Sequence, residues 1–146
     1  MQPKFDISQL DPLAIQLDPL AAEAGAQGYA FMGRLIDEAR SGRNSFDKSG
    51  ECFCGIYLSS ALIGCGGINQ DPYTDQYVGR LRHVYILSEF RRKGVASTLV
   101  KDLLNRSKSS FGVIRLRTSD DQAGRFYEAL GFNPIDHDSA THLIEI

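Results

Sequence analysis

The sequence predicts a mixed α/β (α+β) fold, in which helices pack on a mixed β-sheet. Two neighbouring apolar runs of alternating polarity, separated by a short polar turn, predict a β-hairpin. Further along, an apolar run, a basic turn, an amphipathic segment and another apolar run predict a strand–helix–strand unit. The chain has 146 residues, of which 42% are hydrophobic, so we expect residues 1–146 to form one domain with one core.

The first third of the chain contains one predicted strand and one predicted helix. Two prolines interrupt the N-terminal segment, and a strand is expected between them at Leu13–Leu17. Apolar residues recur every three or four positions over Gly28–Arg40, which predicts a helix that ends before Gly42. The polar segment Ser41–Gly50 is expected to be a loop.

The predicted hairpin occupies the middle of the chain. Polarity alternates over Cys52–Leu58, which predicts a strand, and Ser59-Ser60 provides a short turn. The partner strand is expected at Leu62–Ile68. The polar stretch Asn69–Gln76, with an Asp-Pro pair, predicts a loop before the next strand.

The second half alternates strands and helices. The expected elements are, in order, a strand at Leu81–Leu87, a helix at Gly94–Ser107, a strand at Val113–Thr118, a helix at Asp121–Leu130 and a closing strand at Thr141–Ile146. Ser119 or Asp120 would cap the last helix, and Gly131 would end it. We expect the strand–helix–strand unit to be a right-handed parallel crossover, with the hairpin to one side of it.

The charge distribution favours a small anionic ligand. The net charge is only −2, which argues against a protein that binds nucleic acid. Basic residues nevertheless cluster near the centre of the chain, at Arg80, Arg82, Arg91, Arg92 and Lys93, and further ones follow at Arg115, Arg117 and Arg125. Such a basic centre suits a polyanionic small molecule, although some of these residues are expected to be solvated ends of strands and helices.

The cysteines and the N-terminal segment predict neither a metal site nor a membrane segment. Cys52 and Cys54 would share one face of a strand, and Cys65 lies in another apolar run. Their odd number and their spacing match neither a disulfide framework nor a zinc site, so we expect buried, reduced thiols. The N-terminus lacks an apolar run that could serve as a signal peptide or membrane span. We therefore expect a cytoplasmic protein.

An anion site is expected where the strand at Leu81–Leu87 turns into the following helix. The segment Arg91–Ala96 reads RRKGVA, and the first N–H groups of a helix have no partner within it. The helix dipole adds partial positive charge at the same end. Gly94 lacks a Cβ, which allows a phosphate to approach the backbone closely.

Two segments together resemble the GNAT family of N-acetyltransferases. The spacing Arg-x-x-Gly-x-Ala at 91–96 resembles the family's acyl-CoA pyrophosphate signature. The segment DDQAGRFYEALGF at 120–132 is similar to the family's Asn-x-x-Ala-x-x-Phe-Tyr-x-x-x-Gly-Phe segment, except that Asp120 replaces Asn. The resemblance extends over 50–146 and implies an N-acetyltransferase that uses acetyl-CoA as its acetyl donor.

The resemblance also implies how the cofactor would bind. Family members have a mostly antiparallel sheet with helices on both faces, and one parallel strand pair that splays apart to admit pantetheine. Here that pair would be Leu81–Leu87 and Val113–Thr118, and free backbone groups at Val84 and Ile86 would pair with pantetheine. The remaining cofactor-binding residues would be Arg91, Arg92, Lys93, Gly94, Val95, Ala96, Ser97, Asp120 and Phe126. No metal is implied.

Tyr127 occupies the position at which the family places a general acid. A phenol stays protonated at neutral pH and can donate a proton to the departing CoA thiolate. Tyr127 also lies on an apolar helix stripe, so a core aromatic is the alternative interpretation. The general base stays open among His83, Glu51, Asp71 and Asp75, none of which is distinguished by its spacing.

The acceptor is expected to be a primary amine on a small molecule or a peptide, and its identity is open. A homodimer is left open as well. The alternative function is a non-catalytic module of the same fold that binds or senses acyl-CoA. An enzyme acting on nucleotide phosphates is disfavoured, because the chain has neither a Gly-x-x-x-x-Gly-Lys-Ser/Thr loop nor a Gly-x-Gly-x-x-Gly segment after a strand.

Overall fold

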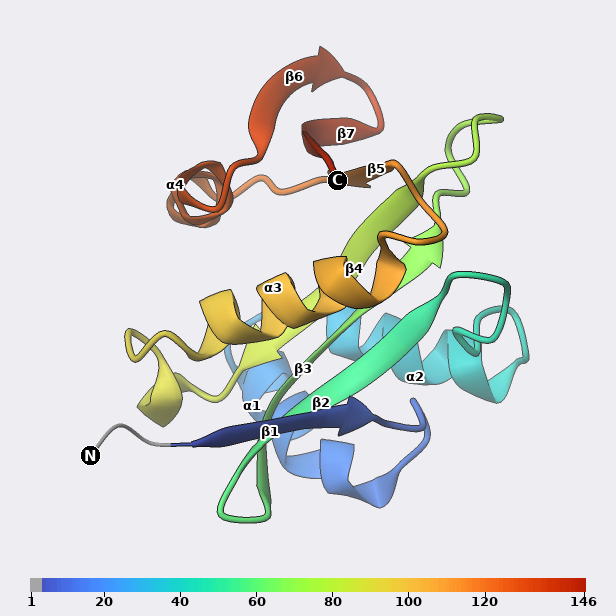
Figure 1. Cartoon of the computed structure of the whole chain (residues 1–146). Helices are drawn as coiled ribbons and strands as arrows, with labels where there is room; N and C mark the ends of the chain where they lie inside the picture. The colour runs from blue at the N-terminus through green and yellow to red at the C-terminus, as the bar shows by residue number, and fades with distance from the viewer. Residues whose placement is uncertain (1–3) are drawn as a thin grey trace.

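The computed structural model describes residues 4–146, which form one seven-stranded sheet in the order β1-β2-β3-β4-β5-β7-β6 (Figure 1). The strands are β1 (Phe5–Gln9), β2 (Cys52–Leu58), β3 (Ala61–Gln70), β4 (Gly79–Ile86), β5 (Val113–Leu116), β6 (Asn133–His137) and β7 (Ala140–Glu145). The α-helices are α1 (Asp18–Ala26), α2 (Phe31–Arg40), α3 (Val95–Ser107) and α4 (Asp121–Ala129), with short 3-10 turns at Ile15–Leu17 and Ser88–Phe90.

The sheet confirms the predicted fold class. Every neighbouring strand pair is antiparallel except β4 and β5, which are parallel. The predicted hairpin is β2–β3, and it lies on the β4 side of the parallel pair. The parallel register contains only Gly79 opposite Ile114 and Arg80 opposite Arg115, so the two strands separate after their first paired residues.

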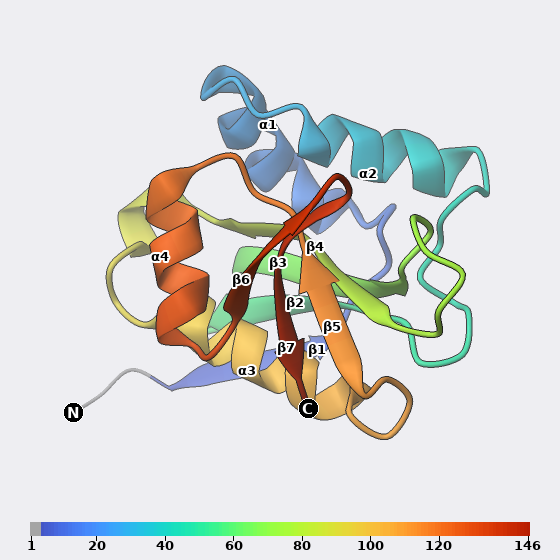
Figure 2. The same cartoon turned by 90° about the horizontal axis from the view of Figure 1, so that it is seen from above.

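Helices cover both faces of the sheet, as predicted. Figure 2 shows α1 and α2 on one face and α3 on the other. The α3 face holds the larger apolar core, which includes Leu99, Leu103, Phe111 and Ile114, and the α4 side chain of Tyr127 packs against it. A second apolar core, with Leu17, Leu20, Met32, Leu35 and Phe46, lies beneath α1 and α2. No helix of residues 4–146 is long and apolar enough to cross a membrane.

The N-terminal prediction was wrong in one element and omitted β1 and α1. The segment Leu13–Leu17 is not a strand; its end forms a 3-10 turn that leads into α1, while the first strand is β1. Pro19 lies in the first turn of α1, where a missing N–H is tolerated.

Strand β6 was not predicted, because its residues are mostly exposed and include Pro134, and such a segment lacks strand alternation.

A β-bulge interrupts β4 at His83. The register against β3 shifts by one residue between Cys65–Tyr85 and Gly67–Arg82, and His83 has φ +60°. Because of the extra residue, the successive side chains of Arg82 and His83 both face α2. His83 lies near the rings of Phe31 and Phe46, at 6.2 and 6.1 Å between centroids, and alternation resumes with Val84, which packs on the α3 core.

A buried charge cluster joins the paired ends of β4 and β5. The Asp71 carboxylate is fully buried, with Oδ2 3.1 Å from Arg115 Nε and 3.4 Å from Arg80 Nη1. The Arg80 guanidinium also lies 4.6 Å from the centroid of the Tyr73 ring, and Arg115 donates a hydrogen bond to Ser139 Oγ. Asp71 therefore separates two positive groups that the parallel register places side by side.

Removing the Asp71 charge should destabilise the fold strongly. In Asp71→Asn two buried guanidinium groups would face each other without a carboxylate, and breaking such a buried pair lowers the free energy of unfolding by about 3–5 kcal/mol. Urea denaturation measures the change. Asp75→Asn, on the exposed part of the same loop, is the control and should change the stability by less than about 0.5 kcal/mol. Equal stabilities of the two variants would show that the cluster contributes nothing.

His83 should make the fold sensitive to acid. Burial, aided by the charges of Arg82 and Arg34, lowers the pKa of His83 to about 3, whereas an unfolded histidine has a pKa of about 6.5. Between these values the unfolded chain binds a proton that the folded chain does not, so stability is lost as the pH falls from about 6.5 toward 3. From pH 7 to pH 5 the free energy of unfolding should fall by about 2 kcal/mol.

The matched variant for this test is His83→Asn, because asparagine tolerates a positive φ and does not titrate. Its stability should vary less between pH 7 and pH 5 than that of the native protein, by about the same 2 kcal/mol. His137→Asn, at an exposed position, should keep the native dependence. A native-like pH dependence in His83→Asn would assign the acid sensitivity to other groups.

Candidate functional site

The open edge of β4 is the central feature of the candidate site. Beyond Arg80 no residue of β5 pairs with β4. The Leu87 N–H donates to Ile63 O on the β3 side at 2.9 Å, so by strand alternation the backbone groups of Ile86 and Val84 point to the opposite, unpaired edge. The sheet is therefore open at Val84 and Ile86, the two residues that were predicted to pair with pantetheine.

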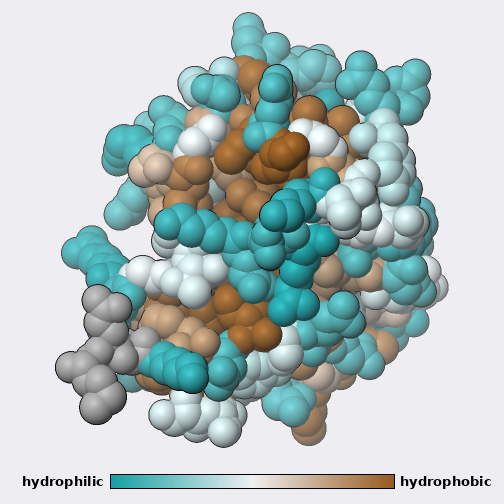
Figure 3. All heavy atoms as spheres, in the orientation of Figure 1, coloured by the Kyte–Doolittle hydropathy of each residue, from teal (hydrophilic) through white to brown (hydrophobic). Residues whose placement is uncertain are grey.

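The start of α3 lies at the wide end of this opening. Gly94 is its N-cap with φ +79°, and no side chain accepts from the first turn. In residues 4–146, the N–H groups of Val95, Ala96 and Ser97 have no acceptor, and the first helical bond runs from Thr98 N to Gly94 O. This helix end is uncapped and exposed, as an anion site requires. Figure 3 shows the surface hollowed between α4 and this turn.

The three basic residues before Gly94 differ in their availability. Arg91 Nε donates to Ile86 O at 2.9 Å, its Nη2 donates to Gln27 Oε1 at 3.1 Å, and its guanidinium lies over the Tyr85 ring. Arg91 thus fastens the turn to β4 and α1, and it occupies a carbonyl on the open edge. Arg92 and Lys93 are exposed beside Gly94, and Lys93 Nζ lies 5.8 Å from the centroid of the Phe90 ring; neither forms an ion pair with another residue of 4–146, so both are available to the predicted phosphate site.

Tyr127 combines a packed ring with an unpaired hydroxyl. The ring lies 5.0 Å from Phe126 and 5.6 Å from Phe132 between centroids, so the apolar stripe predicted for this helix exists. The hydroxyl makes no hydrogen bond to any residue of 4–146, and burial raises the pKa of Tyr127 to about 12. The phenol is therefore protonated at neutral pH and has an unused donor. Its role as general acid stays a prediction.

Asp120 caps α4. Capping is one of the two roles predicted for this residue; the other is binding of the cofactor. Its Oδ1 accepts from Gln122 N at 2.9 Å. A hollow of about 320 Å³ opens at this end of the helix and is also lined by Glu128 and His142, which are 3.0 Å apart. Phe126 packs its ring on the α3 core. Contact of Asp120 or Phe126 with a cofactor stays a prediction.

Three of the four candidate bases are carboxylates and the fourth is His83, and no carboxylate among them lies free beside β4. Asp71 is held between two arginines, and Asp75 is exposed in its loop. Glu51 accepts from Asn69 Nδ2 and Gln70 N at 3.0 and 2.8 Å. The His83 ring is buried with both nitrogens unpaired, and with its pKa lowered to about 3 it is neutral but weakly basic.

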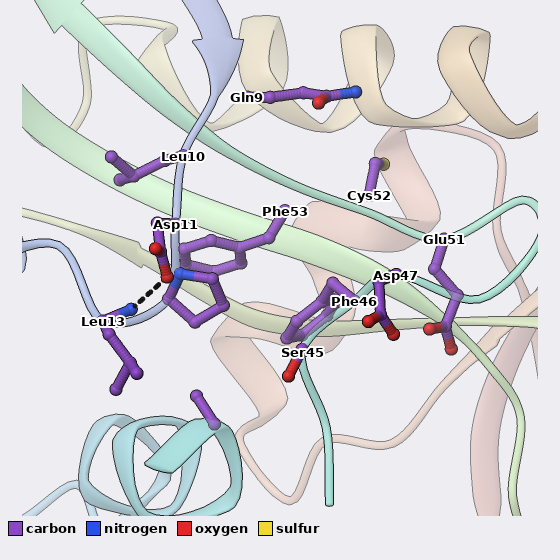
Figure 4. A pocket seen from close by; sticks show the side chains of 12 residues that line it. Gln9, Leu10, Asp11, Leu13, Ser45, Phe46, Asp47, Glu51, Cys52 and Phe53 are labelled. Carbon is purple, nitrogen blue, oxygen red and sulfur yellow. Dashed lines mark hydrogen bonds between the residues drawn. The ribbon is translucent and has the colours of Figure 1, made fainter. Parts of the chain in front are cut away.

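A larger hollow, of about 620 Å³, lies away from the open edge of β4. It is bordered by the end of β1, the start of β2 and the loop before β2, and Figure 4 shows Phe46 and Phe53 with Asp11, Asp47 and Glu51 around it. Three strands separate β1 from the β4–β5 opening. We therefore assign this hollow no part in the candidate site.

The hydrogen-bonded carboxylate of Glu23, which lies beside β4, was not predicted from the sequence. Glu23 accepts from Tyr85 Oη at 2.5 Å, from Ser88 N at 3.0 Å and from Ser88 Oγ at 2.8 Å. These bonds, chiefly that from Tyr85, lower the pKa of Glu23. Since α1 itself was not predicted, no sequence signal placed Glu23 beside β4. The three cysteines are free and buried, as predicted, and residues 4–146 contain no metal-binding cluster of His, Cys, Asp or Glu.

Comparisons with known proteins agree with this geometry. The model of the acetyltransferase (GNAT) family matches residues 22–132. The uncharacterized N-acetyltransferase CgeE of Bacillus subtilis (strain 168) is 38% identical over 72 residues, which are 48% of this chain and 27% of CgeE, so the match spans about a quarter of that relative.

Solved structures share the fold. A putative acetyltransferase from Exiguobacterium sp. 255-15 superposes with a TM-score of 0.85 at 24% identity, over 97% of this chain and 93% of that one. PaiA N-acetyltransferase from Thermoplasma acidophilum, in complex with coenzyme A, has a TM-score of 0.68 at 20% identity, over 96% of both chains. Because the family model covers most of the sequence, this chain belongs to the acetyltransferase (GNAT) family.

Proposed function

We propose that the protein is an N-acetyltransferase that moves the acetyl group of acetyl-CoA to a primary amine. The observation that carries the proposal is the parallel pair β4–β5, which separates after two paired residues and opens toward the uncapped start of α3. A strand edge with free backbone groups suits the amides of pantetheine, and a free helix N-terminus suits the pyrophosphate. The donor would thus be held along β4 from Gly94 inward.

The chemistry would need few protein groups. The neutral amine nitrogen attacks the thioester carbonyl carbon, the C–S bond breaks as the tetrahedral intermediate collapses, and the CoA thiolate takes a proton from the Tyr127 hydroxyl. The nitrogen loses one proton to water or a base, and Tyr127 regains one from solvent. A backbone N–H on the open edge of β4 could stabilise the developing oxyanion.

Binding through the Gly94 turn is tested by Gly94→Glu. The added carboxylate would repel phosphate, so calorimetry should show the affinity for CoA falling more than about tenfold, or about 1.4 kcal/mol. Gly94→Ala is the matched control, since it imposes the same strain at φ +79° without added charge or contact within 4 Å. It should retain most of the affinity. Native affinity in a folded Gly94→Glu protein would reject this phosphate site.

The role of Tyr127 is tested by Tyr127→Phe, which keeps the ring and deletes the donor. We expect kcat, measured by thiol release with an amine panel, to fall about 10²-fold or more, with little change in KM because proton donation acts in the transition state. Tyr57→Phe, on β2, should leave kcat unchanged. Native kcat in Tyr127→Phe, with chemistry rate-limiting, would return Tyr127 to a packing role.

Tight acetyl-CoA binding by the native protein without any thiol release would instead indicate a non-catalytic module.

A further inference from the structure

Four arginines converge where β4 and β5 separate. Arg80 and Arg115 face each other across the last paired rung of the two strands. Arg82 lies two residues beyond Arg80, and so on the same face of β4. The opposite wall is α2, whose Glu38 carboxylate lies 3.9 Å from Arg82 Nη2. Arg34, one turn before Glu38, lies on the same helix face.

The positive charge of this cluster exceeds its negative charge. In the described part of the chain, two carboxylates form ion pairs with these four guanidinium groups: Asp71 lies between Arg80 and Arg115, and Glu38 faces Arg82. The Arg82–Glu38 separation of 3.9 Å is too long for a hydrogen bond. Within residues 4–146, the Arg82 guanidinium donates no hydrogen bond to another residue, although only 20% of the side chain is exposed. A half-buried guanidinium that makes no hydrogen bond to the protein is suited to an anion.

The cluster lies where an acceptor would enter. An acyl group delivered from the Gly94 turn would travel along β4 toward the closed end of the opening. Because of the bulge, Arg82 and Ile86 lie opposite Gly67 and Gly64, which are three residues apart on β3, or about 10 Å at 3.3 Å per residue. The face on which Arg82 lies is the one covered by α2, opposite α3. An amine attacking from that face would have the rest of its molecule beside these guanidinium groups.

The surplus positive charge also acts on ionisable groups nearby. Burial is the main cause of the depressed pKa of His83, the residue that follows Arg82, and the charges of Arg82 and Arg34 add to it. The same like-charge effect would lower the pKa of an ammonium group at this place and so favour the neutral, nucleophilic amine. It would also disfavour acceptors that carry several positive charges.

We propose that the acceptor is an anionic primary amine, bearing a carboxylate or a phosphate, and that Arg82 and Arg34 bind its negative group. The proposal rests on the acetyltransferase function proposed above. Arg80 and Arg115, neutralised in part by Asp71, shape the floor of the site, while Arg82 supplies the unused donors and Arg34 an exposed charge at its rim.

The test compares amines that differ in one charged group. Thiol release is measured with β-alanine against propylamine, with O-phosphoethanolamine against ethanolamine, and with putrescine as a dication. We expect kcat/KM for at least one anionic member to exceed that of its neutral partner more than tenfold, and putrescine to be the poorest acceptor. Whether β-alanine or O-phosphoethanolamine is preferred distinguishes carboxylate from phosphate recognition. Equal kcat/KM values throughout would overturn the proposal and leave the acetyltransferase function intact.

Two variants connect the preference to the arginines. Arg82→Gln should reduce the anionic preference at least tenfold through KM of the amine, with KM for acetyl-CoA unchanged. Arg34→Gln, on the exposed helix surface, should reduce it in the same direction even if Arg82→Gln folds poorly. Arg40→Gln, at the exposed end of α2, is the control. An undiminished preference in both Arg82→Gln and Arg34→Gln would overturn the assignment. No thiol release with any amine, from a protein that binds acetyl-CoA, would reject the transferase function and this proposal with it.

Discussion

The Asp71 carboxylate, buried between Arg80 and Arg115, is the interaction on which the candidate site depends. A parallel register that places two arginines side by side would be repulsive without a counter-ion, and the interior offers little solvent to screen it. With Asp71 present, the two strands are joined at one end and free to separate beyond it. The site needs both properties: a fixed strand pair at its base and an unpaired edge on β4.

The open edge raises a second problem, because unpaired strand edges invite non-specific pairing. Two local features shorten the edge that remains available. The bulge at His83 twists β4 away from a regular ladder, and Arg91 covers the Ile86 carbonyl with its own N–H group. What is left unpaired is a short run of backbone groups around Val84 and the Ile86 N–H. The two helices that follow β4 differ in the same respect: Asp120 caps the start of α4, whereas α3 begins with no side-chain cap and leaves its first N–H groups free.

The sequence predicted what local patterns control and missed what long-range contacts control. Strand β2 was placed at its observed bounds, and α3, β5 and α4 to within about two residues at each end, because their periodicity and their glycine or aspartate termini are strong. The segment Leu13–Leu17 was misassigned because a short apolar run between prolines fits a strand or a helix start equally well. Strand β6 is an exposed edge strand, with no apolar face to reveal it.

The residues of the candidate site also fall into two groups: those found from local motifs and those placed by long-range contacts. Gly94 and Tyr127 were found through short motifs, whereas the pairing of Arg80 with Arg115 joins residues 35 positions apart and depends on strand register. Asp71 was noticed as a carboxylate, but its burial between two arginines follows only from the folded sheet. Glu23 was missed because its partners, Tyr85 and Ser88, lie more than 60 positions away.

The charged side chains on and near β4 lie at the two ends of its open edge. Its C-terminal end leads to Arg92, Lys93 and the free helix start of α3, and its N-terminal half carries Arg80 and Arg82, so positive groups lie at both ends of the open edge. The stretch between them has apolar or neutral side chains: Val84, Ile86 and a His83 that stays uncharged at neutral pH. Two anionic molecules entering from opposite ends would each be attracted to its own end and would meet over the neutral stretch, where only an acyl group and a neutral amine fit without charge repulsion. A chain with net charge −2 can provide this arrangement because Arg80 and Arg82 lie on β4 itself and Arg92 and Lys93 lie in the turn that follows it.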